Sequence, residues 1–135
     1  MEASFIGSKF KQRKISQSQA LGASDQKKLN IKEFFQGKHI LLTGATGFTG
    51  KVLLHKLLKS CSNVGRIYIL LRTKRNTQKV QQLNYLTNSR CFEDLKMEMG
   101  EVAFNQLIQD KIIPISGDLI HEGLGLEFAD RELIT

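Results

Sequence analysis

One short segment in the first half of the chain could bind a phosphate group through its backbone. Residues 43–50 read T-G-A-T-G-F-T-G, with glycines at positions 44, 47 and 50. Gly44 would let the chain turn sharply, Gly47 would let a pyrophosphate approach the backbone, and Gly50 would let a following helix pack closely. The free N–H groups and the dipole at the start of that helix attract an anion. The spacing therefore predicts a phosphate-binding turn, with a purely structural glycine turn as the alternative.

Basic residues follow the next apolar run, at a position where dinucleotide-binding proteins contact the ribose of the cofactor. Arg72 comes directly after this run, Lys74 and Arg75 are close behind, and residues 34–92 contain no acid. NAD binders usually present an acid to the ribose 2′-hydroxyl at this point, whereas an arginine suits a 2′-phosphate. A guanidinium can pair with phosphate through two hydrogen bonds, which favours Arg72 over the lysine. The residues predict NADPH, and a solvated basic loop is the alternative.

A carboxylate follows the third apolar run, in the sequence Ser116-Gly117-Asp118-Leu119. At the carboxyl end of a strand, Asp118 could accept a hydrogen bond from the adenine amino group. A helix-cap or turn aspartate is the alternative. No group of histidines and cysteines has the spacing of a metal site, so we expect no bound metal.

Apolar patterns around these residues predict the elements that position them. Short apolar runs predict parallel strands at residues 39–43, 66–71 and 111–116. Helical spacing predicts a short turn at 31–35 and helices over 51–60, 80–86, 92–95 and 102–108. The β-α-β-α-β order gives an α/β fold, the N-terminal half of a Rossmann-type doubly wound parallel sheet. The strand order 3-2-1 of that fold places Pro114, which lacks a ladder donor, in an edge strand.

Composition is consistent with a globular domain. Of 135 residues, 41% are hydrophobic and 24% charged, which excludes collagen, coiled coil and wholesale disorder. Runs without charge or strong polarity, such as residues 67–71, are far shorter than the roughly 18 residues of a membrane-spanning helix. Cys61 and Cys91 are too few for a disulfide framework or a metal cage, which favours a reducing compartment.

The net charge of +7 hides an asymmetry. Residues 1–90 carry 17 basic and 3 acidic side chains, and residues 91–135 carry 3 basic and 10 acidic ones. The aromatic residues lie in apolar patterns instead of between basic side chains, so we expect no nucleic-acid partner.

Residues 1–29 are basic, rich in Ser and Gln, and lack an apolar period. They predict a disordered tail or a targeting segment, followed by a partial NAD(P)-binding domain at 30–135.

From residue 31 onward the sequence resembles the N-terminal part of the fatty acyl-CoA reductases, in the extended short-chain dehydrogenase/reductase superfamily. The matching segments are 31–38, 39–50, 51–58, 66–72, 112–119 and the Leu124-Gly125-Leu126 triplet. The glycine motif is shared by the whole superfamily. The F-F-x-G-K and I-P-I-x-G-D-L segments are more specific to this family.

This resemblance implies a reaction and a set of binding residues. The family reduces a long-chain fatty acyl-CoA to a primary alcohol, with two hydrides from NADPH and an aldehyde-level intermediate. By the match, the pyrophosphate would be cradled by Gly44, Thr46, Gly47, Phe48, Thr49 and Gly50. Arg72 would meet the 2′-phosphate, and Asp118 and Leu119 would flank the adenine.

Two features depart from the family pattern. Thr49 stands where a bulky aliphatic residue is usual, and its hydroxyl could reach a phosphate or cap a donor. The superfamily's catalytic Tyr-x-x-x-Lys is absent, because Tyr68 is followed four residues later by Arg72 and Tyr85 by Ser89. No catalytic residue can therefore be assigned in this chain.

The sequence also ends after the third predicted strand, which we interpret as a truncated product or a partial gene model. We expect the 135-residue chain alone to be inactive, with the acyl-binding region and any membrane anchor beyond Thr135. A non-catalytic nucleotide-binding fragment and another enzyme of the superfamily, such as a carboxylate or thioester reductase module, are the alternatives. By the same resemblance, peroxisomal, endoplasmic-reticulum and plastid locations are all open.

Overall fold

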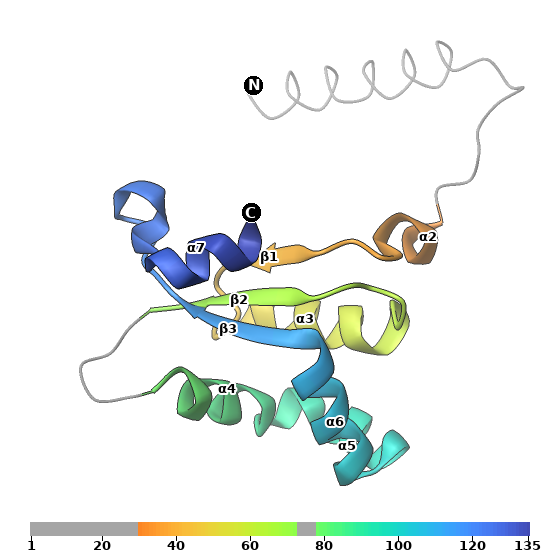
Figure 1. Ribbon diagram of the computed structural model, residues 1–135. Helices are drawn as coiled ribbons and strands as arrows, with labels where there is room; N and C mark the ends of the chain where they lie inside the picture. The colour runs from red at the N-terminus through yellow and green to blue at the C-terminus, as the bar shows by residue number, and fades with distance from the viewer. Residues whose placement is uncertain (1–29, 73–77) are drawn as a thin grey trace, which may run out of the picture. The chain divides into compact units, whose positions relative to one another are not determined.

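The computed structural model describes residues 30–72 and 78–135 (Figure 1). Residues 31–135 form one compact unit. The tail expected at residues 1–29, and Lys74 and Arg75 of the expected basic loop, lie outside the described residues.

Three parallel strands form the sheet, β1 (Ile40–Leu42), β2 (Ile67–Leu71) and β3 (Ile112–Ser116), in the order β1-β2-β3. Ile67 of β2 is in register with Ile40 on one side and Ile112 on the other. The predicted strand order is therefore confirmed. Pro114 lies in β3, an edge strand of this described sheet, where its missing N–H is tolerated.

Helices connect the strands. The helix α3 (Phe48–Ser60) joins β1 to β2, and it starts three residues before the segment predicted from the apolar stripe. Between β2 and β3 lie α4 (Lys79–Thr87), the 3-10 turn η1 (Arg90–Phe92), α5 (Glu93–Met99) and α6 (Glu101–Lys111). Gly100 separates α5 from α6 with a φ of 87°, a backbone conformation that favours glycine. A short helix α2 (Ile31–Phe35) precedes β1 as expected.

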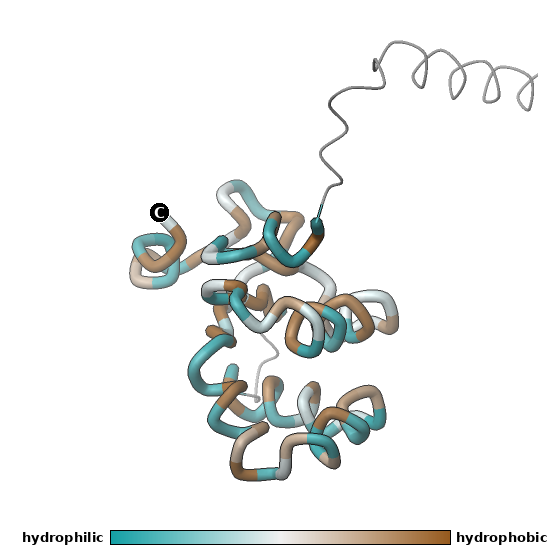
Figure 2. The backbone as a smooth tube through the Cα atoms, turned by 90° about the vertical axis from the view of Figure 1, so that its right-hand side faces the viewer, coloured by the Kyte–Doolittle hydropathy of each residue, from teal (hydrophilic) through white to brown (hydrophobic). Residues whose placement is uncertain are grey.

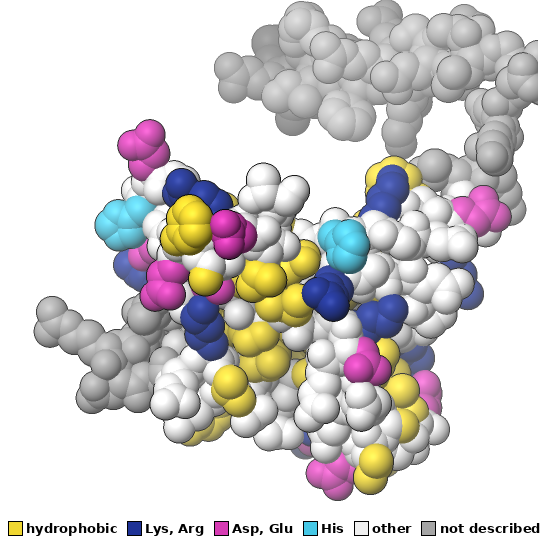
Figure 3. All heavy atoms as spheres, in the orientation of Figure 1, with side chains coloured by type: hydrophobic (Ala, Val, Ile, Leu, Met, Phe, Trp, Pro, Cys, Tyr) yellow, Lys and Arg dark blue, Asp and Glu magenta, His cyan; other side chains and the backbone are white. Residues whose placement is uncertain are grey.

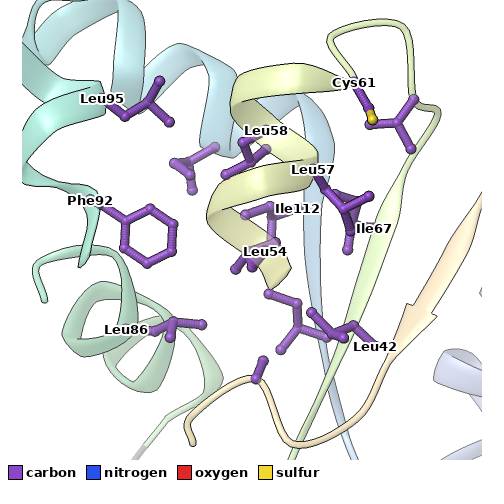
Figure 4. Packing of buried hydrophobic residues seen from close by; sticks show 14 of the residues in the cluster. Leu42, Leu54, Leu57, Leu58, Cys61, Ile67, Leu86, Phe92, Leu95 and Ile112 are labelled. Carbon is purple, nitrogen blue, oxygen red and sulfur yellow. The ribbon is translucent and has the colours of Figure 1, made fainter. Parts of the chain in front are cut away.

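The main hydrophobic core lies between α3, the helical segments after β2 and one face of the sheet (Figure 4). Leu54 of α3, Ile67 of β2 and Phe92 of η1 are completely buried in it. Hydrophobic and hydrophilic residues alternate along the helical segments (Figure 2), as in amphipathic helices that pack one side against a core. This core fixes α3, and with it the turn that leads into the helix, against β1 and β2.

A smaller cluster packs on the opposite face of the sheet. It contains Tyr68, Leu70 and Ile115, with Leu126 and Ile134 packed against them. Ile134 belongs to α7 (Phe128–Ile134), which follows the 3-10 turn η2 (Glu122–Gly125). Hydrophobic side chains also gather near the centre of the surface seen in Figure 3. No pattern in the sequence predicted α7.

No helix in residues 30–72 and 78–135 combines the length and the apolar character that crossing a membrane requires.

Candidate nucleotide-binding site

The glycine-rich turn connects the end of β1 to the start of α3. Gly44 has a φ of 70°, so the sharp exit from the strand uses a conformation that side chains disfavour. A Cβ at Gly50 would collide with the Gly44 carbonyl oxygen and would lie 2.7 Å from Ala45 Cα. The first turn of α3 therefore packs directly on the connecting loop. This is the close packing expected of the third glycine.

Gly47 is in a different situation. It caps α3 with extended backbone (φ −79°, ψ 171°), which any residue can adopt. A Cβ there would lie 3.4 Å from the Gly44 carbonyl oxygen, an ordinary contact. The fold itself thus leaves room for a Cβ at this position, which is compatible with the predicted approach of a pyrophosphate.

The start of α3 offers hydrogen-bond donors to a ligand. Helix geometry leaves the N–H groups of Phe48, Thr49 and Gly50 without acceptors inside the helix. Gly47 makes no side-chain cap, and no acidic residue occupies the first turn. Thr46 is also exposed beside it. This set of donors, with the positive end of the helix dipole, fits a phosphate group.

At the end of β2, the Arg72 side chain projects into solvent and forms an ion pair. Its Nε lies 2.8 Å from Oδ2 of Asp118, which follows β3. The Arg72 side chain is 73% exposed and that of Asp118 only 21%. The structure thus brings together two residues that are predicted from the sequence to meet different parts of a nucleotide.

Asp118 is held by its neighbours in the loop after β3. Its Oδ1 accepts a hydrogen bond from the Ile120 N–H at 3.2 Å, and its own N–H donates to the Leu124 carbonyl at 2.8 Å. Its carbonyl accepts from the His121 N–H at 3.1 Å. The turn role considered for this aspartate is therefore real. Leu119, the next residue, is exposed.

One polar residue at this end of the sheet was missed by the sequence analysis. Asp130 of α7 is 6% exposed, and its Oδ2 accepts hydrogen bonds from Lys79 Nζ at 2.6 Å and from the Ser116 N–H at 3.0 Å. The contact joins α7 to the start of α4 and the end of β3. No local spacing could have shown it, because Lys79 and Asp130 are 51 residues apart.

Charged side chains also join the C-terminal half of α3 to α5. Asp94 lies 2.9 Å from His55 Nε2 and 3.1 Å from Lys59 Nζ, and Lys59 Nζ lies 2.7 Å from Glu98. The hydrogen bond from Lys59, followed by that from His55, lowers the pKa of Asp94 to about 2. The hydrogen bonds to Glu98 and Asp94 raise the pKa of Lys59. These pairs connect two helices and belong to the scaffold.

The described residues offer hydrogen-bond donors that suit a phosphate group, and among them no set of catalytic side chains can be assigned. No three His, Cys, Asp or Glu side chains among them could hold a metal ion together. Tyr68 is buried within β2, and Tyr85 is exposed on α4. The glycine turn, Arg72 and Asp118 follow the carboxyl ends of three parallel strands, the edge at which open α/β sheets bind ligands.

Comparison with known proteins identifies the family of this chain. The model of a NAD-binding family described as "Male sterility protein" matches residues 42–135. The chain is 41% identical over 106 residues to "Fatty acyl-CoA reductase 1" of Mus musculus and 39% identical over 106 residues to the Homo sapiens protein of that name. Each alignment covers 78% of this chain and 19% of the relative. The chain therefore spans about a fifth of the length of these curated relatives.

A solved structure shares the same fold. The chain resembles the reductase domain of a non-ribosomal peptide synthetase from Mycobacterium tuberculosis, with a TM-score of 0.54 and 29% sequence identity. The likeness covers 73% of this chain and 22% of that one. Residues 31–135 thus have the fold of the N-terminal part of a Rossmann-type reductase domain.

Proposed function

Because this chain belongs to the NAD-binding male sterility protein family, we propose that it forms the cofactor-binding part of an NADPH-dependent fatty acyl-CoA reductase. Its relatives and its fold support a reductase function with a nicotinamide cofactor. The choice of NADPH, the long-chain fatty acyl-CoA substrate and the alcohol product are parts of the proposal. They rest on the similarity to the fatty acyl-CoA reductases and on the residues at the sheet edge.

The observation that carries the proposal is the placement of the glycine turn and Arg72 at one edge of the sheet. The turn follows β1, Arg72 follows β2, and all three strands are parallel, so their carboxyl ends share an edge. Open α/β sheets bind their ligands at this edge. A dinucleotide that carries a pyrophosphate and a 2′-phosphate has one anion for each of these two features.

Each predicted residue has a defined task in this proposal. The N–H groups at the start of α3, with Gly44, Thr46, Gly47, Phe48, Thr49 and Gly50 forming the turn around them, would bind the pyrophosphate. Arg72 would bind the 2′-phosphate, and Asp118 and Leu119 would flank the adenine. When bound, NADPH would supply hydride to the acyl carbonyl. This chain's own contribution is to hold and orient the cofactor, since no proton donor can be assigned in it.

An assay on the whole protein that carries this chain tests the proposal. Purified protein is incubated with NADPH and a long-chain acyl-CoA, and NADPH oxidation, free CoA thiol and fatty alcohol are measured together. We expect two NADPH oxidised for each CoA released, with alcohol as the product and slower turnover with NADH. Tight NADPH binding without oxidation that depends on an acyl-CoA would contradict the substrate assignment.

A second candidate is a reductase that acts on a different thioester or on a carboxylate. The similarity to the Mycobacterium tuberculosis reductase domain favours keeping it. The same assay with an N-acetylcysteamine thioester of the same fatty acid separates the two. Faster turnover of the thioester that lacks CoA would favour this second candidate.

A further inference from the structure

The contact between Arg72 and Asp118 points to a role for the aspartate in cofactor choice. We propose that Asp118 is a specificity-determining residue that opposes Arg72, so that it limits the preference for a 2′-phosphate over a 2′-hydroxyl. This inference rests on the proposed function, because it presupposes that Arg72 is the residue that meets the 2′-phosphate. It differs from the adenine contact expected of Asp118, which would be the same for both cofactors.

The geometry makes the carboxylate a competitor for the guanidinium. Oδ2 of Asp118 is 2.8 Å from Nε of Arg72, so one edge of the guanidinium already faces an anion. A 2′-phosphate must either displace this carboxylate or bind at the remaining nitrogens of the same guanidinium. In either case the phosphate gains less from Arg72 than it would from an unpaired arginine.

The two partners are not equally free to move. Asp118 is anchored by a hydrogen bond from Ile120 to its carboxylate and by two backbone hydrogen bonds with His121 and Leu124. Arg72 is mostly exposed. The aspartate therefore stays beside any phosphate that reaches the arginine, and the repulsion between the two anions is built into the site.

Both physical effects have the same sign. Removal of the Asp118 charge frees the guanidinium and removes the repulsion, and each change favours the 2′-phosphate. A ligand with a 2′-hydroxyl gains nothing from either change. Because the Arg72 side of the pair is largely solvent-exposed, the effect is modest, and we expect a change of about two- to fivefold in the ratio of affinities.

The test uses 2′,5′-ADP and 5′-AMP, which differ only in the 2′-phosphate. Dissociation constants are measured by titration calorimetry for the whole protein with the substitutions Asp118→Asn, Arg72→Ala and both together. Asp118→Asn keeps an oxygen that can accept from Ile120. Asp118→Ser is a second uncharged variant in case the first one folds poorly. Glu122→Gln is the matched control, since it removes one exposed charge from the same loop without touching the pair.

We expect Asp118→Asn and Asp118→Ser to raise the preference for 2′,5′-ADP, and Glu122→Gln to leave it unchanged. In the Arg72→Ala background the rise from Asp118→Asn should be smaller, because no guanidinium remains to be freed. An unchanged or lower preference in both Asp118 variants, or an equal rise in Glu122→Gln, overturns the inference. If Arg72→Ala does not lower the preference, the assignment of the 2′-phosphate to Arg72 fails instead, and with it the premise of the proposed function's cofactor choice.

Discussion

The two halves of the candidate site are built in different ways. The turn between β1 and α3 is made of backbone, and its geometry depends on glycines within seven residues of one another. The pair at the ends of β2 and β3 is made of side chains, Arg72 and Asp118, that meet only after the whole sheet has formed. The first half is a local structure, and the second is a product of tertiary folding. Substitutions in the two halves should therefore have different effects on stability and on nucleotide affinity.

The largest effect is expected inside the turn, at Gly50. Gly50→Ala places a Cβ against the Gly44 carbonyl oxygen and Ala45. Since both obstacles are backbone, relief requires α3 to move away from the loop, and we expect a loss of about 3 kcal/mol or more in the free energy of unfolding. Chemical denaturation of the whole protein measures it. An unchanged denaturation midpoint would contradict the packing role.

Gly47→Val should separate binding from folding. The backbone at Gly47 accepts a β-branched residue, so we expect the free energy of unfolding to fall by about 1 kcal/mol or less. The branched side chain would stand where we propose that the pyrophosphate approaches, so binding of both NADPH and NADH should be lost. Titration of both nucleotides checks this. Retained affinity in a folded variant would refute the close-approach role.

Arg72→Ala should change cofactor choice more than overall binding. A charge-assisted hydrogen bond contributes roughly 1.5 to 3 kcal/mol, which corresponds to about a tenfold to 150-fold loss of NADPH affinity. NADH affinity should change little. Arg66→Ala is the matched control, because Arg66 is an exposed arginine at the opposite end of β2. Equal losses for the two nucleotides would remove Arg72 from the 2′-phosphate site.

The smallest effect is expected outside the site, at Asp94. Its pKa is lowered to about 2 by Lys59 and His55, so the stabilisation is present above the ordinary value of 3.8 and is lost as the pH falls toward 2. Asp94→Asn should slightly lower the free energy of unfolding near neutral pH. The free energy of unfolding of this variant should also depend less on pH under acidic conditions. Nucleotide affinity should stay unchanged. A shift in that affinity would mean that these ion pairs also position the turn.

The sequence allowed the backbone architecture and the turn to be predicted because both leave local signals. The buried strands appear as short apolar runs, and Pro114 and Gly100 mark an edge and a helix break. The start of α3 was predicted three residues late, because Phe48, Thr49 and Gly50 were assigned to the glycine-rich turn and the apolar stripe begins only at Val52.

Contacts between distant side chains left no such signal. Arg72 and Asp118 were each singled out from the ends of their strands, but their pairing depends on how β2 and β3 align. Asp130 was missed because α7 has seven residues, too few for a clear helical period. Its contacts with Lys79 and Ser116 exist only in the folded sheet.

The central claim is that this chain binds NADPH through the turn and through Arg72. Titration of the whole protein with NADPH and with NADH, side by side under the same salt conditions, tests it most directly. We predict binding of both cofactors, with NADPH at least about tenfold tighter because of the charge-assisted contact to its 2′-phosphate. Equal affinities, or tighter binding of NADH, would contradict the claim.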